Sequence, residues 1–409
     1  MDTTNGTDLR QERGRLLSKN PGIRKVAGVT WLVPSQTQTS GGYIVNTADG
    51  TCTCPDYELR RCRCKHQFAV SFVQTVEIDA DGNQTVTETL SYSRTTYKQD
   101  WPAYTAAQCE EKGTVQRLLR GICDGIQNTP HLGRGRKPIP MSDAVFAMTM
   151  KVYGMMSGRR STADLEAYAE AGHMAKAPRF STLFERFEDP AMTAILTSLI
   201  EKSAAPLAGI ERSFAVDSTG FGTCTYVRWI DEKYGKPMKR ATWLKAHAMV
   251  GTSTQIITSV RVTASNANDC PELPALVQST KQRFDMAEVS ADRAYLSNEN
   301  LTAIEAAGAA PFVPFKINSQ QDGSPAWRKM HAVFVLKEEE FLAAYAKRSS
   351  VESTFSSLKR KFGQAVKSKT FTAQVNEILC KVLCHNLSCL AMAMQKIGIE
   401  PSFLGKVTA

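Results

Sequence analysis

Residues 341–363, FLAAYAKRSSVESTFSSLKRKFG, decide how the rest of the chain is interpreted. Four polar residues lie here, the later three at offsets of three, seven and fourteen from the first: Tyr345, Arg348, Glu352 and Lys359. If the stretch is one α-helix, these residues fall within about 60° of one another on a single face. An apolar stripe beside them would dock the helix on a core: Val351, Phe355, Leu358 and Phe362. The alternative is an amphipathic helix whose charges simply face water.

Two other stretches each place a carboxylate at the end of a predicted strand. Residues 214–220 (FAVDSTG) indicate a buried strand that ends at Asp217 and turns at a glycine. Residues 286–295 (MAEVSADRAY) place Asp292 at the end of another strand. From about Gly209 onward the pattern alternates, with strands expected at 212–216, 224–229, 245–250, 255–262, 287–290 and 311–316, and helices at 271–284, 298–307, 341–362 and 373–396. This pattern predicts an α/β domain with a mixed sheet covered by helices.

A strand Asp, a strand Asp and a helix Glu, in this order, resemble the catalytic triad of DDE transposases, which share the RNase H-like fold. The spacing Tyr-x2-Arg-x3-Glu-x6-Lys is similar to a signature of the bacterial insertion-sequence branch of that family, and Tyr295, three residues after Asp292, fits as well. The resemblance covers roughly residues 209–393. It implies that Asp217, Asp292 and Glu352 are catalytic and hold Mg²⁺ or Mn²⁺.

The chemistry needs these residue types. Cutting a phosphodiester, or joining a 3′-hydroxyl to one, builds charge on the attacking and leaving oxygens, and two divalent ions about 3.5–4 Å apart stabilise both. Mg²⁺ prefers carboxylate oxygens and keeps water for its other positions. The resemblance implies that nearby side chains contact DNA phosphates: Tyr345, Arg348, Lys359, Arg360 and Lys361. Only 59 residues separate Asp292 from Glu352, which leaves no room for a large β insertion and puts hairpin-type end processing in doubt.

A cluster of cysteines lies near the N-terminus. Cys52 and Cys54 form one pair, and Cys64 with His66 forms a second pair nine residues later. Three thiolates and one imidazole suit a structural zinc ion, because four protein ligands leave no position for a catalytic water. The order C-x-C…C-x-H resembles the SWIM zinc finger, although Cys62 is a surplus thiol that could compete with Cys64. Flanking β-rich stretches in 22–47 predict a hairpin, and residues 67–76 a helix.

The middle of the chain is helical and basic. Helices are expected at 115–126, 143–155, 162–170 and 182–187, with N-caps at Ser142, Ser161 and Ser181. From 112 to 186 there are twelve Lys/Arg against six Asp/Glu. Short helices with tight turns suit a helix-turn-helix type of DNA reader, and the stretch loosely resembles the N-terminal helical region of insertion-sequence transposases.

An extended basic tract, GRGRKP at 133–138, lies between the first two of these helices and is similar to an AT-hook core. Its cationic residues could enter a narrow minor groove: Arg134, Arg136 and Lys137. A solvated basic loop explains the tract equally well.

Length and composition limit the number of domains and the kinds of partner that the chain can have. A chain of 409 residues predicts two or three domains, and a net charge of +10 favours a polyanionic partner. We expect a flexible N-terminus (1–20), a zinc module (21–100) with a hairpin turn at Asp81-Gly82, a helical DNA-binding region (101–208) that begins with a linker at Trp101-Pro102, an RNase H-like catalytic domain (209–396) and a tail (397–409). No signal peptide and no apolar run long enough to span a bilayer is expected, and the eleven cysteines indicate thiols or metal ligands.

The resemblance implies a DNA transposase of an insertion sequence, which would cleave element ends and transfer strands into target DNA. Its partner would be double-stranded DNA, paired ends would require a dimer or larger assembly, and its place would be the bacterial cytoplasm at the nucleoid. Two alternatives stay open: a non-catalytic DNA-binding regulator on the same scaffold, and a nuclease without strand transfer.

Overall fold

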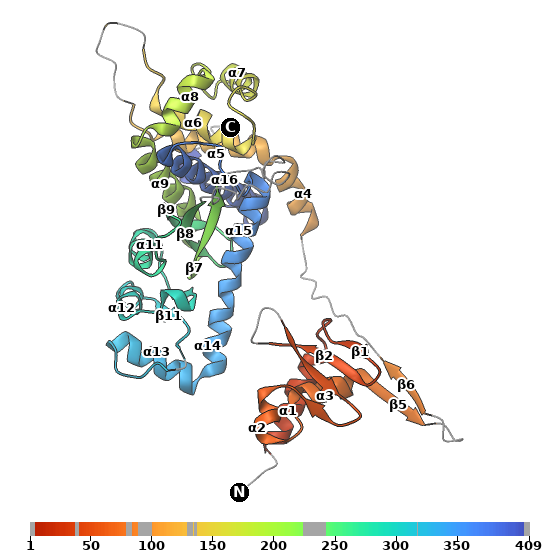
Figure 1. The fold of residues 1–409 in the computed structure, drawn as a ribbon. Helices are drawn as coiled ribbons and strands as arrows, with labels where there is room; N and C mark the ends of the chain where they lie inside the picture. Colours follow the sequence, from red (N-terminus) through yellow and green to blue (C-terminus); the bar gives the residue numbers. More distant parts are fainter. Residues whose placement is uncertain are drawn as a thin grey trace, which may run out of the picture. The chain divides into compact units, whose positions relative to one another are not determined.

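Two units make up the chain, residues 1–98 and residues 99–409, and each has its own hydrophobic core (Figure 1). The computed structural model describes residues 5–36, 41–78, 84–88, 100–128, 134, 137–223, 243–316 and 318–404.

The first unit is a small four-stranded antiparallel sheet packed with helices. Its sheet has the order β1-β2-β3-β4, with β1 (Arg24–Ala27), β2 (Thr30–Pro34), β3 (Gly42–Asn46) and β4 (Thr51–Cys52). The helices are α1 (Asn5–Leu17), α2 (Pro55–Arg60) and α3 (Lys65–Val73). A two-stranded sheet pairs β5 (Gln74–Ile78) with β6 (Gln84–Glu88); the hairpin turn expected at Asp81-Gly82 lies outside the described residues.

Where a flexible N-terminus is expected, α1 packs closely on α3. A Cβ on Gly14 would come within 2.4 Å of the Cβ of Phe68, so the two helices approach this closely only because position 14 is glycine. Leu17 is buried in the same core as Trp31 and Val33, which alternate inward along β2. Helix α1 is thus part of the first unit, which the polar composition of residues 1–20 concealed.

The second unit is built on a five-stranded mixed sheet of order β11-β10-β7-β8-β9. Its strands are β7 (Ser213–Gly222), β8 (Trp243–Gly251), β9 (Ile257–Ala264), β10 (Glu288–Ala291) and β11 (Ala310–Phe312). Strand β8 is antiparallel to both of its neighbours, β7 and β9, whereas β10 runs parallel to both β7 and β11. The mixed α/β architecture expected from the sequence is confirmed; the strand expected at 224–229 lies outside the described residues.

Helices surround this sheet. They are α4 (Trp101–Cys109), α5 (Glu111–Asp124), α6 (Met141–Tyr153), α7 (Thr162–Glu170), α8 (Phe180–Glu188), α9 (Ala191–Ala204), α11 (Leu273–Lys281), α12 (Asn298–Ala306), α13 (Pro325–Leu336), α14 (Glu338–Tyr345), α15 (Ser349–Phe362) and α16 (Phe371–Ile397). Short 3-10 turns are η1 (Ala205–Leu207), η2 (Cys270–Glu272), η3 (Arg293–Tyr295), η4 (Ala346–Arg348) and η5 (Ser402–Leu404).

Helix α16 is the central helix of this unit and packs against α9, α6, α5 and α8. By length and composition it could cross a membrane, contrary to the expectation that no run is long enough, but 78% of its most apolar window is buried inside the protein. A buried core helix passes the same test, and α16 has that role here.

Several expectations about local structure are wrong. The strand ending at Asp217 continues to Gly222, because β8 pairs with it along its whole length. The expected helix 341–362 is broken by η4, and α13 was not anticipated. Trp101-Pro102 begins α4 rather than a linker. Ser142 and Ser181 lie inside their helices, where Pro140 and Arg179 hold the N-cap positions.

Candidate active site and metal centre

The two strand aspartates lie side by side at one edge of the sheet. In the parallel pairing of β10 with β7, Ala291 is opposite Val216, so the residues that follow them, Asp292 and Asp217, occupy neighbouring positions. Asp292 leaves the strand and becomes the N-cap of η3, where its carboxylate accepts the N–H of Arg293 at 2.7 Å. Asp217 remains within β7 and is half-buried.

Helix α15 brings Glu352 to the same edge. Figure 1 shows α15 running alongside β7, and the two elements are in contact. The helix is held by its buried stripe: Val351, Phe355, Leu358 and Phe362. This stripe is the one expected from the sequence, and it leaves the carboxylate of Glu352 on the exposed side.

Arg348 joins two of the three carboxylates. Its guanidinium donates to Oδ2 of Asp217 at 2.9 Å and to Oε1 of Glu352 at 2.6 Å. It also lies 5.8 Å from the ring centroid of Tyr345. Arg348 therefore shares one face with Tyr345 and Glu352, as expected, and that face lies against β7, so its guanidinium also reaches Asp217.

The charges at this edge act on one another. Burial raises the pKa of the Asp217 carboxyl above its ordinary value, the N–H of Ser218 and the Arg348 guanidinium lower it, and the negative charges of Asp292 and Glu352 raise it further. Burial is also the main cause that raises the pKa of the Tyr345 phenol. Asp217 is repelled by both of the other carboxylates and is partly neutralised by Arg348, and hard divalent ions prefer carboxylate oxygens of this kind. Among the described residues the three carboxylates are not gathered closely enough to form a ready ligand set, so ions would have to draw their side chains together.

Other basic side chains predicted to contact DNA differ in environment. Arg360 is exposed, whereas the ammonium of Lys361 is paired with Glu111 on α5. These two residues are 250 positions apart, so no local sequence pattern predicts the pair. Lys359 lies two helical turns from Glu352, with its ammonium 5.5 Å from the ring centroid of Phe221.

In the basic tract before α6, Arg134 and Lys137 are exposed, and Arg136 lies outside the described residues.

A cluster of four buried ligand groups lies in the first unit. The sulfurs of Cys52, Cys54 and Cys64 and a ring nitrogen of His66 all lie within 4.8 Å of one another. Nδ1 of His66 is 3.9 Å from Sγ of Cys52 and 3.8 Å from Sγ of Cys64. A tetrahedral zinc with Zn–S near 2.3 Å and Zn–N near 2.0 Å has edges of roughly 3.5–3.8 Å, so the set fits such an ion. Cys62 is not part of it.

Secondary structure positions these ligands. Cys52 ends β4, Cys54 is the N-cap of α2, and Cys64 with His66 opens α3. The hydrogen bond with Cys52 is the largest cause that lowers the pKa of the Cys64 thiol to about 4, which favours a thiolate at the centre of the set. Gln67 holds the turn, because its side chain accepts the N–H of Cys64 at 2.8 Å and donates to the carbonyl of Gly50 at 2.6 Å.

Comparison with protein families gives one result that bears on the carboxylate edge. Residues 209–387 match the transposase DDE domain family. We call this stretch the DDE region. The match supports a transposase function for the chain and, with it, DNA binding. Comparisons with curated proteins and with solved structures found no match.

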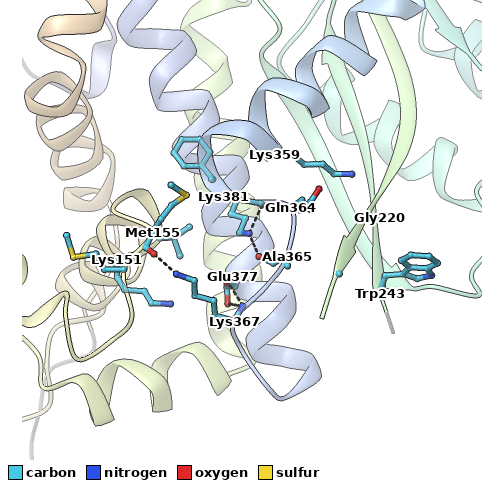
Figure 2. A pocket seen from close by; sticks show the side chains of 15 residues that line it. Lys151, Met155, Gly220, Trp243, Lys359, Gln364, Ala365, Lys367, Glu377 and Lys381 are labelled. Atoms are coloured by element: carbon cyan, nitrogen blue, oxygen red, sulfur yellow. Dashed lines mark hydrogen bonds between the residues drawn. The ribbon is translucent and has the colours of Figure 1, made fainter. Parts of the chain in front are cut away.

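The DDE region contains all eight residues for which the resemblance implies a role at the reacting DNA, apart from the zinc ligands and the basic tract: Asp217, Asp292, Tyr345, Arg348, Glu352, Lys359, Arg360 and Lys361. Sequence reasoning missed a basic cavity beside Lys359, lined also by Lys151 and Lys381 (Figure 2). The available signal was a lone lysine in each of two otherwise apolar helical runs, MSDAVFAMTMKVY and ILCKVLCHNL.

Proposed function

We propose that this protein is a DNA transposase of the insertion-sequence type, which cleaves the ends of its element and joins them to target DNA with Mg²⁺ or Mn²⁺. The observation that carries the proposal is the convergence of Asp217, Asp292 and Glu352 at one sheet edge inside the DDE region. The sheet, three antiparallel strands followed by two parallel ones, supports an RNase H-like fold for the region.

The carboxylates would hold the divalent ions, which supply a Lewis acid for the reacting phosphate when bound. Asp217 and Asp292 are fixed by the sheet and Glu352 by α15, so their positions are set before DNA arrives. Arg348, now bonded to two of them, would turn toward a phosphate oxygen once metal ions take over its neutralising role. Tyr345 beneath the guanidinium would keep it at this edge.

The remaining parts would bind rather than react. Helices within 101–208, together with Arg134, Arg136 and Lys137, would hold the flanking DNA, and the zinc module of 21–100, similar to a SWIM finger, would stabilise a DNA-binding or protein-binding surface around a structural zinc. Two element ends must meet for transposition, so the active assembly would be at least a dimer, acting at the bacterial nucleoid in the cytoplasm.

The proposal is tested by incubating the full-length protein with its flanking genomic DNA and Mg²⁺ or EDTA. We expect nicks at the element boundaries, followed by joined products, in the presence of Mg²⁺ and neither product in the presence of EDTA. Nicks without joining would indicate a nuclease, and specific binding without nicks would indicate a DNA-binding regulator.

A matched set of alanine variants tests the cations near Glu352. Arg348→Ala and Lys359→Ala are expected to lower the cleavage rate by roughly 10- to 100-fold, as loss of a group near a metal site does. In each variant the loss of overall DNA affinity should be smaller than the loss of cleavage rate, because the other basic residues still supply most of the binding. Arg360→Ala is the control, because Arg360 is exposed and points away from that edge. Cleavage rates and affinities should be measured side by side; equal small effects at all three positions would count against an active site here.

A further inference from the structure

A basic cavity adjoins the carboxylate edge of the second unit. Its volume is about 520 Å³, and its walls come from α6, β7, α15, the segment after α15, and α16. Four lysines line it: Lys151, Lys359, Lys367 and Lys381 (Figure 2). The carboxylate in its wall is Glu377.

Two of these lysines and the carboxylate are engaged within the wall. Nζ of Lys381 donates to the carbonyl oxygens of Gly363 at 2.9 Å and Ala365 at 2.6 Å. Nζ of Lys367 donates to the carbonyl of Met155. Glu377 accepts the N–H of Lys367 at 3.0 Å, and both the N–H and the hydroxyl of Ser368 at 2.8 and 2.7 Å. These bonds fix the segment between α15 and α16, as the dashed lines in Figure 2 indicate.

Lys151 and Lys359 are different. Among the described residues neither ammonium has a hydrogen bond or ion pair, although Lys151 as a whole is only 6% exposed. Their neighbours are aromatic: Lys151 lies 5.0 Å from the ring centroid of Phe187, and Lys359 lies near Phe221. Burial is the first cause that lowers the pKa of both ammonium groups. Both lysines line the cavity, and the charge of Glu377 also acts on Lys151. A partly desolvated ammonium without a hydrogen-bond acceptor gains from an anion placed beside it, so an anion in the cavity would be held by two cations.

The size of the cavity indicates what the anion belongs to. Pockets of roughly 300–1,000 Å³ hold small organic ligands, so this one exceeds the need of a free phosphate and suits one nucleotide unit. Gly220 leaves one wall open, since a Cβ placed there would meet no atom within 4 Å.

The position of the cavity relates it to the reacting phosphate. Gly220 is three residues beyond Asp217 on β7, about 10 Å away at the rise of a strand. Lys359 follows Glu352 by seven residues, about 10.5 Å along α15. Successive nucleotides advance about 3.4 Å along the axis of a duplex and further along an extended strand, so a separation of about 10 Å corresponds to a few nucleotides at most.

We propose that this cavity binds a phosphodiester group of the DNA strand being cut, within a few nucleotides of the reacting phosphate, with Lys151 and Lys359 as its two cationic ligands. That the phosphate belongs to DNA rests on the proposed function; that the cavity binds a phosphate ester rests on the two unpaired lysines. Lys151 comes from α6, so the same contact would fix the helical region on DNA already held by the DDE region.

The test uses the full-length, zinc-loaded protein in a Glu352→Gln background, so that binding is measured without cleavage. Lys151→Met keeps the length of the side chain and removes its charge, Lys151→Arg keeps the charge, and Lys396→Met is the control at an exposed position in the last turn of α16. Affinity for a duplex carrying the element end is measured over a range of salt concentrations, and melting temperature is measured with and without inorganic phosphate.

Lys151→Met is expected to weaken duplex binding about tenfold or more and to reduce the log–log salt slope by about 0.9, with Lys151→Arg close to the parent and Lys396→Met unchanged. Its melting temperature without ligand should be equal or higher, since an unpaired buried charge is gone. A lower melting temperature with unchanged binding would make Lys151 a structural residue and overturn the proposal.

Two other outcomes separate the sources of the anion. If inorganic phosphate raises the melting temperature of the parent but not of Lys151→Met, while both proteins bind the duplex equally well, the cavity holds a free phosphate. The assignment to DNA is then wrong. If the wild-type protein cleaves no DNA but duplex binding still depends on Lys151, the proposed function fails and the phosphodiester site stands.

Discussion

Replacing Glu352 by glutamine is expected to lower DNA cleavage and strand transfer by more than about 100-fold, the upper end of what loss of a group that merely supports a metal site costs. The amide keeps the shape of the side chain but removes the charge that a divalent ion requires. Glu352 is 59% exposed on α15, so the fold should tolerate the change. DNA affinity should stay within roughly twofold, as for surface substitutions in general.

Asp217→Asn and Asp292→Asn are expected to be equally inactive, because each carboxylate would contribute to the same ions. The measurement is a cleavage and joining assay with Mg²⁺, run beside a binding assay for each variant. Substantial joining by Glu352→Gln would remove Glu352 from the catalytic set, whereas loss of binding together with activity would point to damage of the fold.

Cys64→Ser is expected to abolish zinc binding and unfold the first unit. Structural zinc in small modules contributes an apparent binding free energy of about 10–16 kcal/mol, which is as large as the whole folding stability of about 5–15 kcal/mol of an ordinary domain. Cys64 is fully buried among the other ligands. Metal analysis of the full chain should give one zinc per wild-type chain and none for this variant, with rapid proteolysis confined to residues 1–98.

Cys62→Ser is the matched control, since Cys62 is partly exposed and lies outside the ligand cluster. It should keep its zinc and its resistance to protease. If Cys62→Ser loses the metal and Cys64→Ser retains it, Cys62 rather than Cys64 is the third thiolate ligand, and the assignment of the second ligand pair is wrong.

Local pattern was enough to locate the parts of the carboxylate edge. The apolar stripe of α15 and the buried residues ahead of Asp217 and Asp292 are short-range features, and the structure has helix and strands there. The extent of β7 was not predictable in this way, because it depends on pairing with β8, whose partner residues are far along the chain.

The contacts that give this edge its electrostatics are long-range. Helical spacing predicted that Arg348 lies beside Glu352, but its second partner, Asp217, is 131 positions away. Likewise Lys361 meets Glu111 only because the fold brings the last turn of α15 to the first turn of α5. No periodicity in the sequence encodes such pairs, and the unpaired Lys151 stands out only once its surroundings are known.

The most direct test of the central claim is to count the divalent ions bound at the carboxylate edge. Mn²⁺ binding, followed by electron paramagnetic resonance on the full-length, zinc-loaded protein with an uncleavable DNA end, should differ between wild type and Asp292→Asn. We expect tightly bound Mn²⁺ in the wild type and loss of at least one ion in Asp292→Asn, with DNA still bound to both. Equal Mn²⁺ binding by both proteins would contradict it.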